Sequence, residues 1–286
     1  MQKNSKMDSK TFCAGIVTYN PDIERLDENI NAIKKQVSQV VIVDNGSFQN
    51  LESRYASQEG IFVIRNAENE GIACALNQIC SYALDNGFEW AVTLDQDSVA
   101  PSNLIDVYNE QRLTDKVGML TPQIYDRNCG LIKDNERGDT ENVDMCITSA
   151  SAIKLYAWQQ IGGFYEPFFI DAVDFDVCYC LREQGFDILR CNKVRLLHEL
   201  GHSRIVNFMG SRTVLYNHSS LRYYYISRNA LLLGHRHNCI KHWFLTIMKR
   251  LILVLLYEDN KYSKFKMFYK GIKDYCKGQF GRYEGK

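Results

Sequence analysis

Short apolar runs alternate with segments of helical periodicity through the first hundred residues, and this rhythm constrains the fold more than any other feature. The runs are rich in β-branched residues, which favours strands, and the segments between them repeat apolar residues at helical spacing. Such alternation is typical of βαβ units, which build a mainly parallel sheet covered by helices, so we predict an α/β protein. The predicted strands are 12–18, 40–43, 61–64 and 90–94, and the predicted helices are 23–36 and 71–86.

Three of the predicted strands run directly into polar turns. Tyr19 and Asn20 follow the first strand, Asp44 follows the second, and Asp95 follows the fourth. Ligands of open α/β sheets bind beyond the carboxyl ends of the strands, so we expect these turns to line one cleft. A helix after Asp171 and a further strand are expected to form the rest of the site.

The length of 286 residues bounds the number of domains. Because domains usually hold about 100–200 residues, we expect one large body and an appendage. The sequence has no internal repeat and no low-complexity linker. We predict a polar tail at 1–10, a catalytic body at 11–235 and a C-terminal helical segment at 236–286.

Charge and cysteine usage narrow the class of protein. Thirty-four Lys and Arg balance thirty-four Asp and Glu, so no global field would concentrate a nucleic acid, and no nucleic-acid partner is expected. The ten cysteines sit singly on apolar segments, and Cys178 and Cys180 lack the spacing of a zinc site. Residues 1–10 lack the apolar stretch of a signal peptide. We therefore expect reduced thiols and a cytoplasmic location.

Asp95 and Asp97 are the first candidates for metal ligands. Residues two apart in an extended segment point to the same side, so both carboxylates can face one ligand. Mg²⁺ and Mn²⁺ prefer oxygen ligands and are often held by one or two carboxylates and by substrate phosphates. The alternative is structural, with the two aspartates ending a strand and capping the helix that opens near Pro101.

Asp44 can accept a hydrogen bond from a ribose hydroxyl or from the N–H of a pyrimidine base. The alternative is an Asx turn that serves the backbone alone. No GxGxxG motif follows the first strand, so the phosphate-binding loop of a dinucleotide dehydrogenase is missing.

A second group of aspartates, Asp171, Asp174 and Asp176, leads into a predicted helix. Acidic residues in a first helical turn interact favourably with the helix dipole, which accounts for at least one of them. Residues two apart on a helix point to different sides, so Asp174 and Asp176 are expected to differ in role. One of the three can act as a general base.

Taken in order, these motifs resemble family 2 of the inverting glycosyltransferases with the GT-A fold, and particularly its rhamnosyltransferase branch. The resemblance spans roughly residues 12–229. It is carried by two nucleotide-binding loops at 17–21 and 43–47, an NxG loop at 69–71, a DxD segment at 93–98 and a base-delivering segment at 162–174.

The resemblance implies a Rossmann-type mixed sheet flanked by helices, with a C-terminal helical appendage. It implies Asp174 as the catalytic base, with Asp171 or Asp176 as alternatives, because many relatives carry Glu-Asp where this chain has Val173 and Asp174. It also implies that Mg²⁺ or Mn²⁺ is held by Asp97 and His198. Residues implied to bind the nucleotide sugar are Thr18, Tyr19, Asn20, Asp44, Asn69, Gly71 and Asp95, and those implied to contact the acceptor or diphosphate are Ser149, Ser151, Asp171 and Arg228.

Two of these implied roles have structural alternatives. One histidine defines no metal geometry, so His198 can instead belong to the core or the surface. Arginine is well shaped to bind phosphate, but Arg228 follows three tyrosines and can instead lie on a packed aromatic helix.

The implied activity is transfer of L-rhamnose from dTDP-L-rhamnose, with inversion, onto a hydroxyl of a growing surface polysaccharide such as an O-antigen or of a lipid-linked glycan. A UDP-hexose donor and a catalytically silent nucleotide-sugar-binding protein are alternatives. A metal-dependent nuclease or phosphatase would use the same acidic residues, but it leaves the turns at Tyr19, Asp44 and Gly71 unexplained.

The run 243–257 is apolar, interrupted by two charges, and shorter than the about 20 apolar residues that span a bilayer. Residues 261–286 carry eight positive and two negative charges, which suits anionic headgroups. We predict peripheral attachment to the inner face of the cell membrane, with packing on the body or a homodimer interface as the alternative. As a helix the run would have a polar face of His242, Thr246, Lys249 and Arg250 and an apolar face of Phe244, Ile247, Leu251, Val254 and Leu255.

Overall fold

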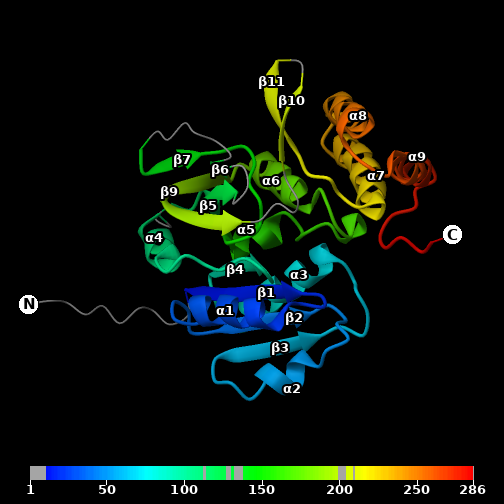
Figure 1. The fold of residues 1–286 in the computed structure, drawn as a ribbon. Helices are drawn as coiled ribbons and strands as arrows, with labels where there is room; N and C mark the ends of the chain where they lie inside the picture. The colour runs from blue at the N-terminus through cyan, green and yellow to red at the C-terminus, as the bar shows by residue number, and fades with distance from the viewer. Residues whose placement is uncertain are drawn as a thin grey trace, which may run out of the picture.

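The computed structural model describes residues 11–111, 114–126, 130–131, 138–198, 204–208 and 210–285. Nine of the described strands form one sheet in the order β3-β2-β1-β4-β8-β5-β9-β7, with β6 beside β5 (Figure 1). The strands of this sheet are β1 Phe12–Thr18, β2 Val40–Asp44, β3 Ile61–Arg65, β4 Trp90–Asp95, β5 Val117–Asp126, β6 Gly130–Leu131, β7 Thr140–Asn142, β8 Ser151–Lys154 and β9 Asp187–His198.

The first four strands run parallel, as their alternation with helices predicts. β8 then pairs antiparallel with both β4 and β5, whereas β5 and β9 are parallel, so the sheet is mixed. The expected α/β class with a mixed sheet is therefore confirmed. The four expected strands are present within one residue of their predicted ends.

Helices cover both faces of the sheet because its strands are apolar on both sides. In β2, Val40 and Ile42 enter one buried cluster while Val41 and Val43 enter the other, as the two-residue period of a strand requires. The first cluster is completed by α1 Ile23–Ile33, α2 Leu51–Tyr55 and α4 Leu104–Gln111. The second is completed by α3 Ile72–Asp85, α5 Leu155–Gln160 and α6 Val173–Glu183.

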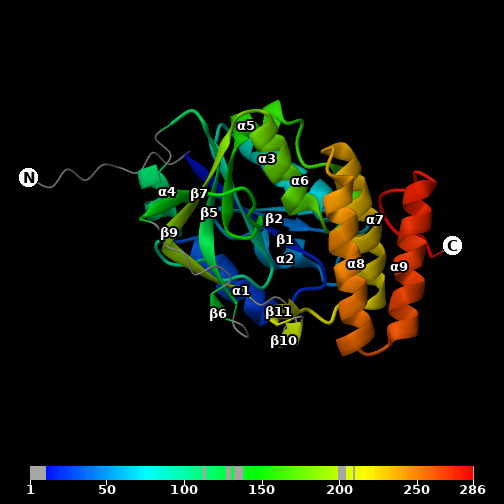
Figure 2. The ribbon, with the colours of Figure 1, turned by 90° about the horizontal axis from the view of Figure 1, so that it is seen from above.

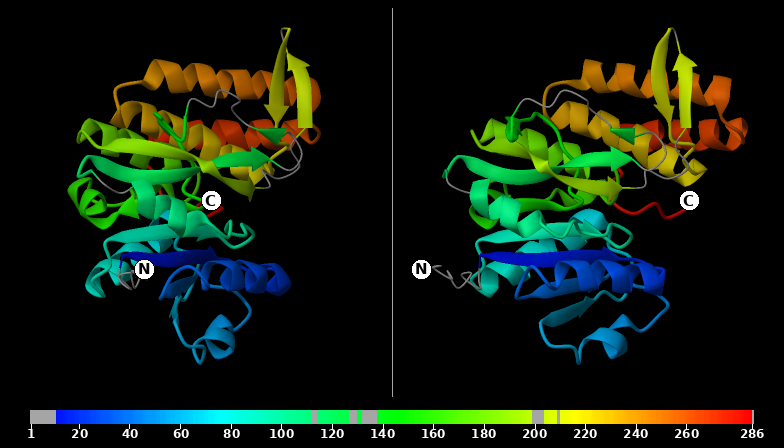
Figure 3. Two further views of the ribbon diagram at one scale, coloured as in Figure 1. Left: turned by 90° about the vertical axis from the view of Figure 1, so that its left-hand side faces the viewer. Right: turned by 60° about the vertical axis from the view of Figure 1, so that its left-hand side comes forward.

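Three C-terminal helices form a separate layer on the far side of the molecule from β3 and α2 (Figure 3). α7 Ser220–Arg236 lies between α8 Ile240–Tyr257 and α9 Lys261–Cys276 (Figure 2). Gly271 allows α9 to pack closely against α7, because a Cβ at this position would lie 2.3 Å from the carbonyl oxygen of Tyr224 on α7. Leu232 and Leu233 of α7 enter the second sheet cluster, so this layer is anchored to the body. The domain boundary at 235/236 falls at the end of α7 and stays a prediction.

The apolar face expected on α8 divides into two parts. Ile247 and Val254 are buried against α7, as the protein-packing alternative requires. Phe244 and Leu255 instead face outward, 47% and 48% exposed, with Leu245, Ile252 and Leu256. Among the described helices, none is long and apolar enough to cross a membrane.

Smaller elements border these layers. The hairpin of β10 Arg204–Phe208 and β11 Ser211–Leu215 is held to α8 by a hydrogen bond from the Tyr257 hydroxyl to the Asn207 carbonyl oxygen, 2.7 Å long. The short helix η1 Glu166–Phe168 lies between α5 and α6. The cysteines within the described residues are free thiols.

Candidate active site

A cavity of about 940 Å³ lies beyond the carboxyl ends of β1 and β4. The first half of the chain contributes the turns after these strands and the start of α3. The second half contributes residues of β5, the segments before β8 and α6, and side chains of α7 and α8. Nine of the expected site residues line this cavity, namely Thr18, Tyr19, Asn69, Gly71, Asp95, Asp97, Ser149, Asp171 and Asp174.

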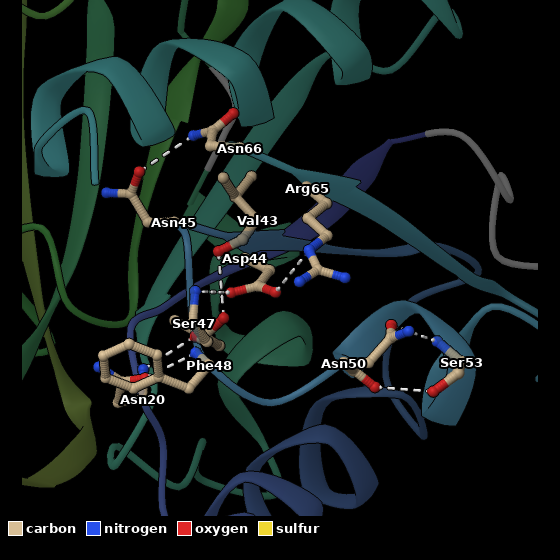
Figure 4. Close-up of polar contacts among 11 residues, drawn as sticks. Asn20, Val43, Asp44, Asn45, Ser47, Phe48, Asn50, Ser53, Arg65 and Asn66 are labelled. Carbon is tan, nitrogen blue, oxygen red and sulfur yellow. Dashed lines mark hydrogen bonds and ion pairs between the residues drawn. The ribbon is translucent and has the colours of Figure 1, made fainter. Parts of the chain in front are cut away.

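Asp44 lies behind the cavity wall, 0% exposed at the end of β2. One of its carboxylate oxygens accepts a hydrogen bond from the Ser47 N–H, and the Ser47 hydroxyl accepts one from the Asn20 N–H. The Asn20 side chain in turn accepts one from the Phe48 N–H (Figure 4). The second oxygen, Oδ2, lies 3.9 Å from Nε of Arg65 and has no hydrogen-bond partner in the described residues. The network joins the turns after β1 and β2, and it leaves one buried acceptor for a hydroxyl or base N–H.

Asn20 and Asp44 were expected to bind the nucleotide sugar from turns that line the cleft. Neither residue lines the cavity, so the expectation of a cavity-lining position is corrected for both. Asn45, the neighbour of Asp44, lines the cavity instead. Its amide nitrogen donates to Oδ1 of Asn69 and to the carbonyl oxygen of Gly71, both at 3.1 Å. This amide fixes the loop before α3 against the end of β2.

Gly71 is required at the start of α3 for two separate reasons. Its φ of 90° lies in a region that L side chains rarely adopt. A Cβ would also lie 2.6 Å from the carbonyl oxygen of Phe169, which accepts a hydrogen bond from the Ile72 N–H. Gly71 thus joins the donor-side loop to the segment that precedes α6.

The turn after β4 presents Asp95 and Asp97 to the cavity. Its backbone is held on several sides: Asn29 donates to the Asp95 carbonyl oxygen at 2.8 Å, and Arg25 donates to the Asp97 carbonyl oxygen at 3.2 Å. The Gln96 side chain accepts the Tyr19 N–H at 2.8 Å. The Asp97 carboxylate is exposed and makes no hydrogen bond or ion pair with another described residue. Such a free carboxylate in a held turn suits a hard cation.

Asp174 stands in the first turn of α6 and lines the same cavity. Its Oδ1 accepts two hydrogen bonds from Thr148, one from the N–H at 2.9 Å and one from the hydroxyl at 2.6 Å. Burial raises the pKa of Asp174 above its usual value, the Thr148 hydrogen bonds oppose this, and the charge of Asp171 adds to it. A carboxylate held through one oxygen, with a raised pKa, is suited to accept a proton.

The other two aspartates of this group are engaged by cations. Asp171 forms an ion pair with Arg222, at 2.5 Å between Oδ2 and Nε. Asp176 faces away from the cavity, 2% exposed, and accepts from Arg236 at 2.9 Å and from His237 at 2.8 Å. As α-helical spacing predicts, Asp174 and Asp176 point to different sides. Asp176 is therefore wrong as an alternative base.

Asp176, Cys180 and His237 place one potential ligand atom each within 4.8 Å of the others. However, the Arg236 guanidinium already occupies Asp176. Burial opposes protonation of His237, but hydrogen bonds with Asp176, Cys180 and Glu183 raise its pKa to about 10. A protonated imidazole must lose its proton before it can ligate a metal, and Mg²⁺ and Mn²⁺ prefer oxygen donors. We interpret the cluster as an ion-pair network that holds α6 to α7.

Three further expected residues do not reach the cavity or lie outside the described side chains. Arg228 is 0% exposed and donates to the carbonyl oxygens of Phe168 and Gly281, so its expected contact with acceptor or diphosphate is wrong. Ser151 is also buried, and its hydroxyl donates to the Ile147 carbonyl oxygen at 2.6 Å. His198 ends β9, but its side chain lies outside the described residues.

The cavity also contains residues that the sequence did not single out for the site. Thr148 positions Asp174. Arg222 and Arg250 line the wall formed by the C-terminal layer, and Tyr216 and His218 line it from the segment that precedes α7. Arg222 opens the run of three tyrosines that leads to Arg228 and so belongs to the family-like segment. No motif spacing indicates the other four, because they reach the cavity through contacts between distant elements.

Comparisons with known proteins add a family and a set of similar folds. The profile of glycosyl transferase family 2 matches residues 13–159. Over 235 residues the chain is 29% identical to dTDP-rhamnosyl transferase RfbF of Shigella flexneri, covering 77% of this chain and 78% of that protein.

Solved structures with the same fold have low sequence identity to this chain. TarS 1–349 of S. aureus in complex with UDP-GlcNAc superposes with a TM-score of 0.58 at 14% identity, covering 93% of this chain and 81% of that chain. GalNAc-T7 with UDP, GalNAc and Mn²⁺ gives a TM-score of 0.59 at 14% identity, covering 88% of this chain. This chain spans only 59% of the GalNAc-T7 chain. The GT-A-like arrangement expected from the motifs is thereby confirmed.

Proposed function

Because the chain belongs to glycosyl transferase family 2, we propose that it transfers L-rhamnose from dTDP-L-rhamnose, with inversion, to a hydroxyl of a growing surface polysaccharide or lipid-linked glycan. The family makes the chain a glycosyltransferase. Similarity to dTDP-rhamnosyl transferase RfbF supports the choice of donor. O-antigen synthesis is the pathway that we propose from the same similarity.

One observation carries the proposed chemistry: Asp174 lines the same cavity as Asp95 and Asp97. A single displacement needs a base on the acceptor side and a site for the leaving diphosphate on the donor side. The first requirement is met by Asp174, held through Oδ1 by Thr148. The second is met by the turn after β4 with the loop at Gly71.

In the proposed step, the acceptor oxygen attacks the anomeric carbon as the bond from that carbon to the diphosphate oxygen breaks. The acceptor proton passes to the free oxygen of Asp174, and dTDP leaves with the electron pair of the broken bond. A β-linked donor then gives an α-linked product. We assign Thr18, Tyr19 and Asn69 to the nucleotide sugar. We assign Asp44 to its base or ribose through Oδ2, which has no hydrogen-bond partner in the described residues.

We propose that Mg²⁺ or Mn²⁺ is bound by Asp97 with help from Asp95, and that His198 is a further ligand. The exposed, unpaired carboxylate of Asp97 fits such an ion. When bound, the ion would neutralise charge on the departing diphosphate.

Purified protein should bind dTDP-rhamnose more tightly than UDP-linked hexoses in calorimetric titrations, and turnover should stop in a chelator. Asp97→Asn should abolish turnover while the fold persists, whereas Asp106→Asn, at an exposed aspartate on α4, should not. Tighter binding of a UDP-hexose than of dTDP-rhamnose would overturn the proposed donor. Full activity in a chelator would overturn the proposed requirement for a metal. Tight donor binding without turnover on any acceptor tested would favour the catalytically silent alternative.

We also propose that the protein acts at the inner face of the cell membrane. Leu245 and Leu256 on the outward face of α8 are each 58% exposed, and Lys241 and Lys249 on the same helix are exposed beside them. Apolar side chains flanked by lysines suit an anionic lipid surface.

Vesicle sedimentation tests this location. The protein should pellet with phosphatidylglycerol vesicles and do so less in high salt, since screening weakens charge attraction. The double variant Leu245→Glu and Leu256→Glu should stay in the supernatant, whereas Tyr156→Glu, at an exposed residue of α5, should not. A wild-type dimer that ignores vesicles and dissociates in the double variant would show a homodimer interface instead.

A further inference from the structure

Within the described residues, the wall of the cavity formed by the C-terminal layer carries one cation without an acidic partner. Arg222 of α7 is compensated by Asp171. Arg250 of α8 lines the cavity too, but it has no carboxylate partner within the described part of the chain. Its guanidinium carbon lies 5.6 Å from the centre of the Tyr216 ring, a cation–π contact that limits its orientations.

His218 extends this wall. Its ring stacks on Tyr216 at 5.4 Å between centroids and 4° between planes. Burial and the nearby charges of Arg222, Arg250 and Lys264 lower the pKa of His218 to about 3, so the ring is neutral at physiological pH. Glu258 is 2.7 Å from Lys264 and neutralises it, so the positive charge open to a ligand belongs to Arg250.

We propose that Arg250, with Tyr216 and His218, forms a subsite for a phosphate group on the acceptor. Guanidinium groups bind phosphate oxygens in pairs, and a stacked guanidinium loses less freedom on binding. The subsite adjoins the Asp171–Arg222 pair, which precedes the proposed base Asp174 in the chain, so it lies with the acceptor-side residues. This assignment rests on the proposed function.

The same helix indicates what the phosphate is attached to. Arg250 points into the cavity while Phe244, Leu255 and Leu256 of α8 remain exposed. These three side chains lie about 120–140° around α8 from Arg250, on its outer face. A phosphate in the subsite would therefore be about one helix diameter, ~10 Å, from an apolar surface that can accept a hydrocarbon chain. The acceptor class is a glycan or sugar linked through phosphate to a lipid.

The test uses geranyl phosphate, a short soluble lipid phosphate, titrated into the full chain with Mg²⁺ and saturating dTDP. Saturating dTDP occupies the donor site, so binding of geranyl phosphate in this titration must come from a second phosphate site. Wild-type protein should bind geranyl phosphate and not geraniol. Arg250→Met should weaken geranyl phosphate binding about 10-fold or more, as expected for a lost charge-assisted bond, and leave dTDP binding within about 2-fold. The affinity of Arg250→Lys for geranyl phosphate should lie between those of wild type and Arg250→Met, since lysine keeps the charge but lacks the paired N–H donors of a guanidinium.

Lys35→Met is the control, because Lys35 is exposed, lies outside the C-terminal helices and does not line the cavity. It should leave both affinities unchanged. Wild-type protein that binds dTDP but no geranyl phosphate would overturn the subsite and leave the proposed function standing. Weaker dTDP binding by Arg250→Met would overturn it as well, by assigning Arg250 to the donor diphosphate. Failure to bind dTDP at all would instead count against the proposed function.

Discussion

Replacing Asp174 by Asn removes the proposed base with little change in shape. Both Thr148 hydrogen bonds end on Oδ1, and an asparagine amide oxygen can accept the same two bonds. The variant therefore loses the second carboxylate oxygen and the negative charge. A missing general base slows a reaction by about 10²–10⁴, which corresponds to about 3–5 kcal/mol in the barrier.

The same substitution should not weaken the fold. Burial raises the pKa of Asp174 in the folded protein. A group with a raised folded pKa contributes stability below its unfolded pKa, and that contribution is lost as pH rises through the folded value. At neutral pH the ionised carboxylate is therefore a cost to the fold, so Asp174→Asn should melt at the same temperature as wild type or higher.

The assay follows dTDP release from dTDP-rhamnose with acceptor, beside donor binding by calorimetry and thermal melting. Wild-type kcat should fall as pH drops through the raised pKa of Asp174, because the base must be ionised. Asp171→Asn is the comparison, and it should affect turnover less, since Asp171 is paired with Arg222. A variant Asp174→Asn with more than about a tenth of wild-type kcat would refute the role. An inactive Asp171→Asn beside an active Asp174→Asn would reassign the base.

Three further predictions follow from particular contacts. Gly71→Ala should lower stability and donor affinity, because the strained backbone alone costs about 1–3 kcal/mol and the new Cβ would also meet the Phe169 carbonyl oxygen. Gly162→Ala, with a φ of 77° and open space around the new Cβ, should lose only the strain, and equal losses of melting temperature in the two variants would contradict this. Arg228→Met should lose at least about 2 kcal/mol of unfolding free energy with unchanged donor KM, whereas a raised KM in a stable variant would restore a ligand role. Because its pKa is raised, protonated His237 contributes stability that is fully present below about pH 6.5 and is lost as the pH rises towards about 10. His237→Gln should therefore flatten the decline of unfolding free energy between these pH values. An unchanged slope would exclude the His237 ion pair as the source of the decline.

Local sequence patterns predicted the parallel half of the sheet well. β1 begins and ends where its apolar run does, and β2 and β4 each extend one residue to include Asp44 and Asp95. Both strands are buried on both faces, so their continuous apolar runs differ from the polar turns that follow. The rule that turns at strand ends share one cleft likewise predicted that Tyr19 and Asp97 would line the same cavity.

The remaining features depend on contacts that no local pattern records. Arg250 is placed by packing of α8 on α7, and helical periodicity alone put it on a solvated face. Arg228 is buried because carbonyl groups from η1 and from the residues after α9 surround its guanidinium. The Thr148 contact with Asp174 joins residues 26 positions apart. Tertiary structure decides these three cases.

The configuration of the transferred sugar tests the central proposal most directly. Proton NMR would follow dTDP-β-L-rhamnose with the purified protein, Mg²⁺ and acceptor, and would read the coupling of the anomeric proton and carbon in the new bond. Single displacement with Asp174 as base predicts an α-L-rhamnosyl product from wild-type protein. The Asp174→Asn variant, which cannot activate the acceptor hydroxyl, should form almost no product. A β-L-rhamnosyl product would contradict inversion and the assignment of Asp174 together.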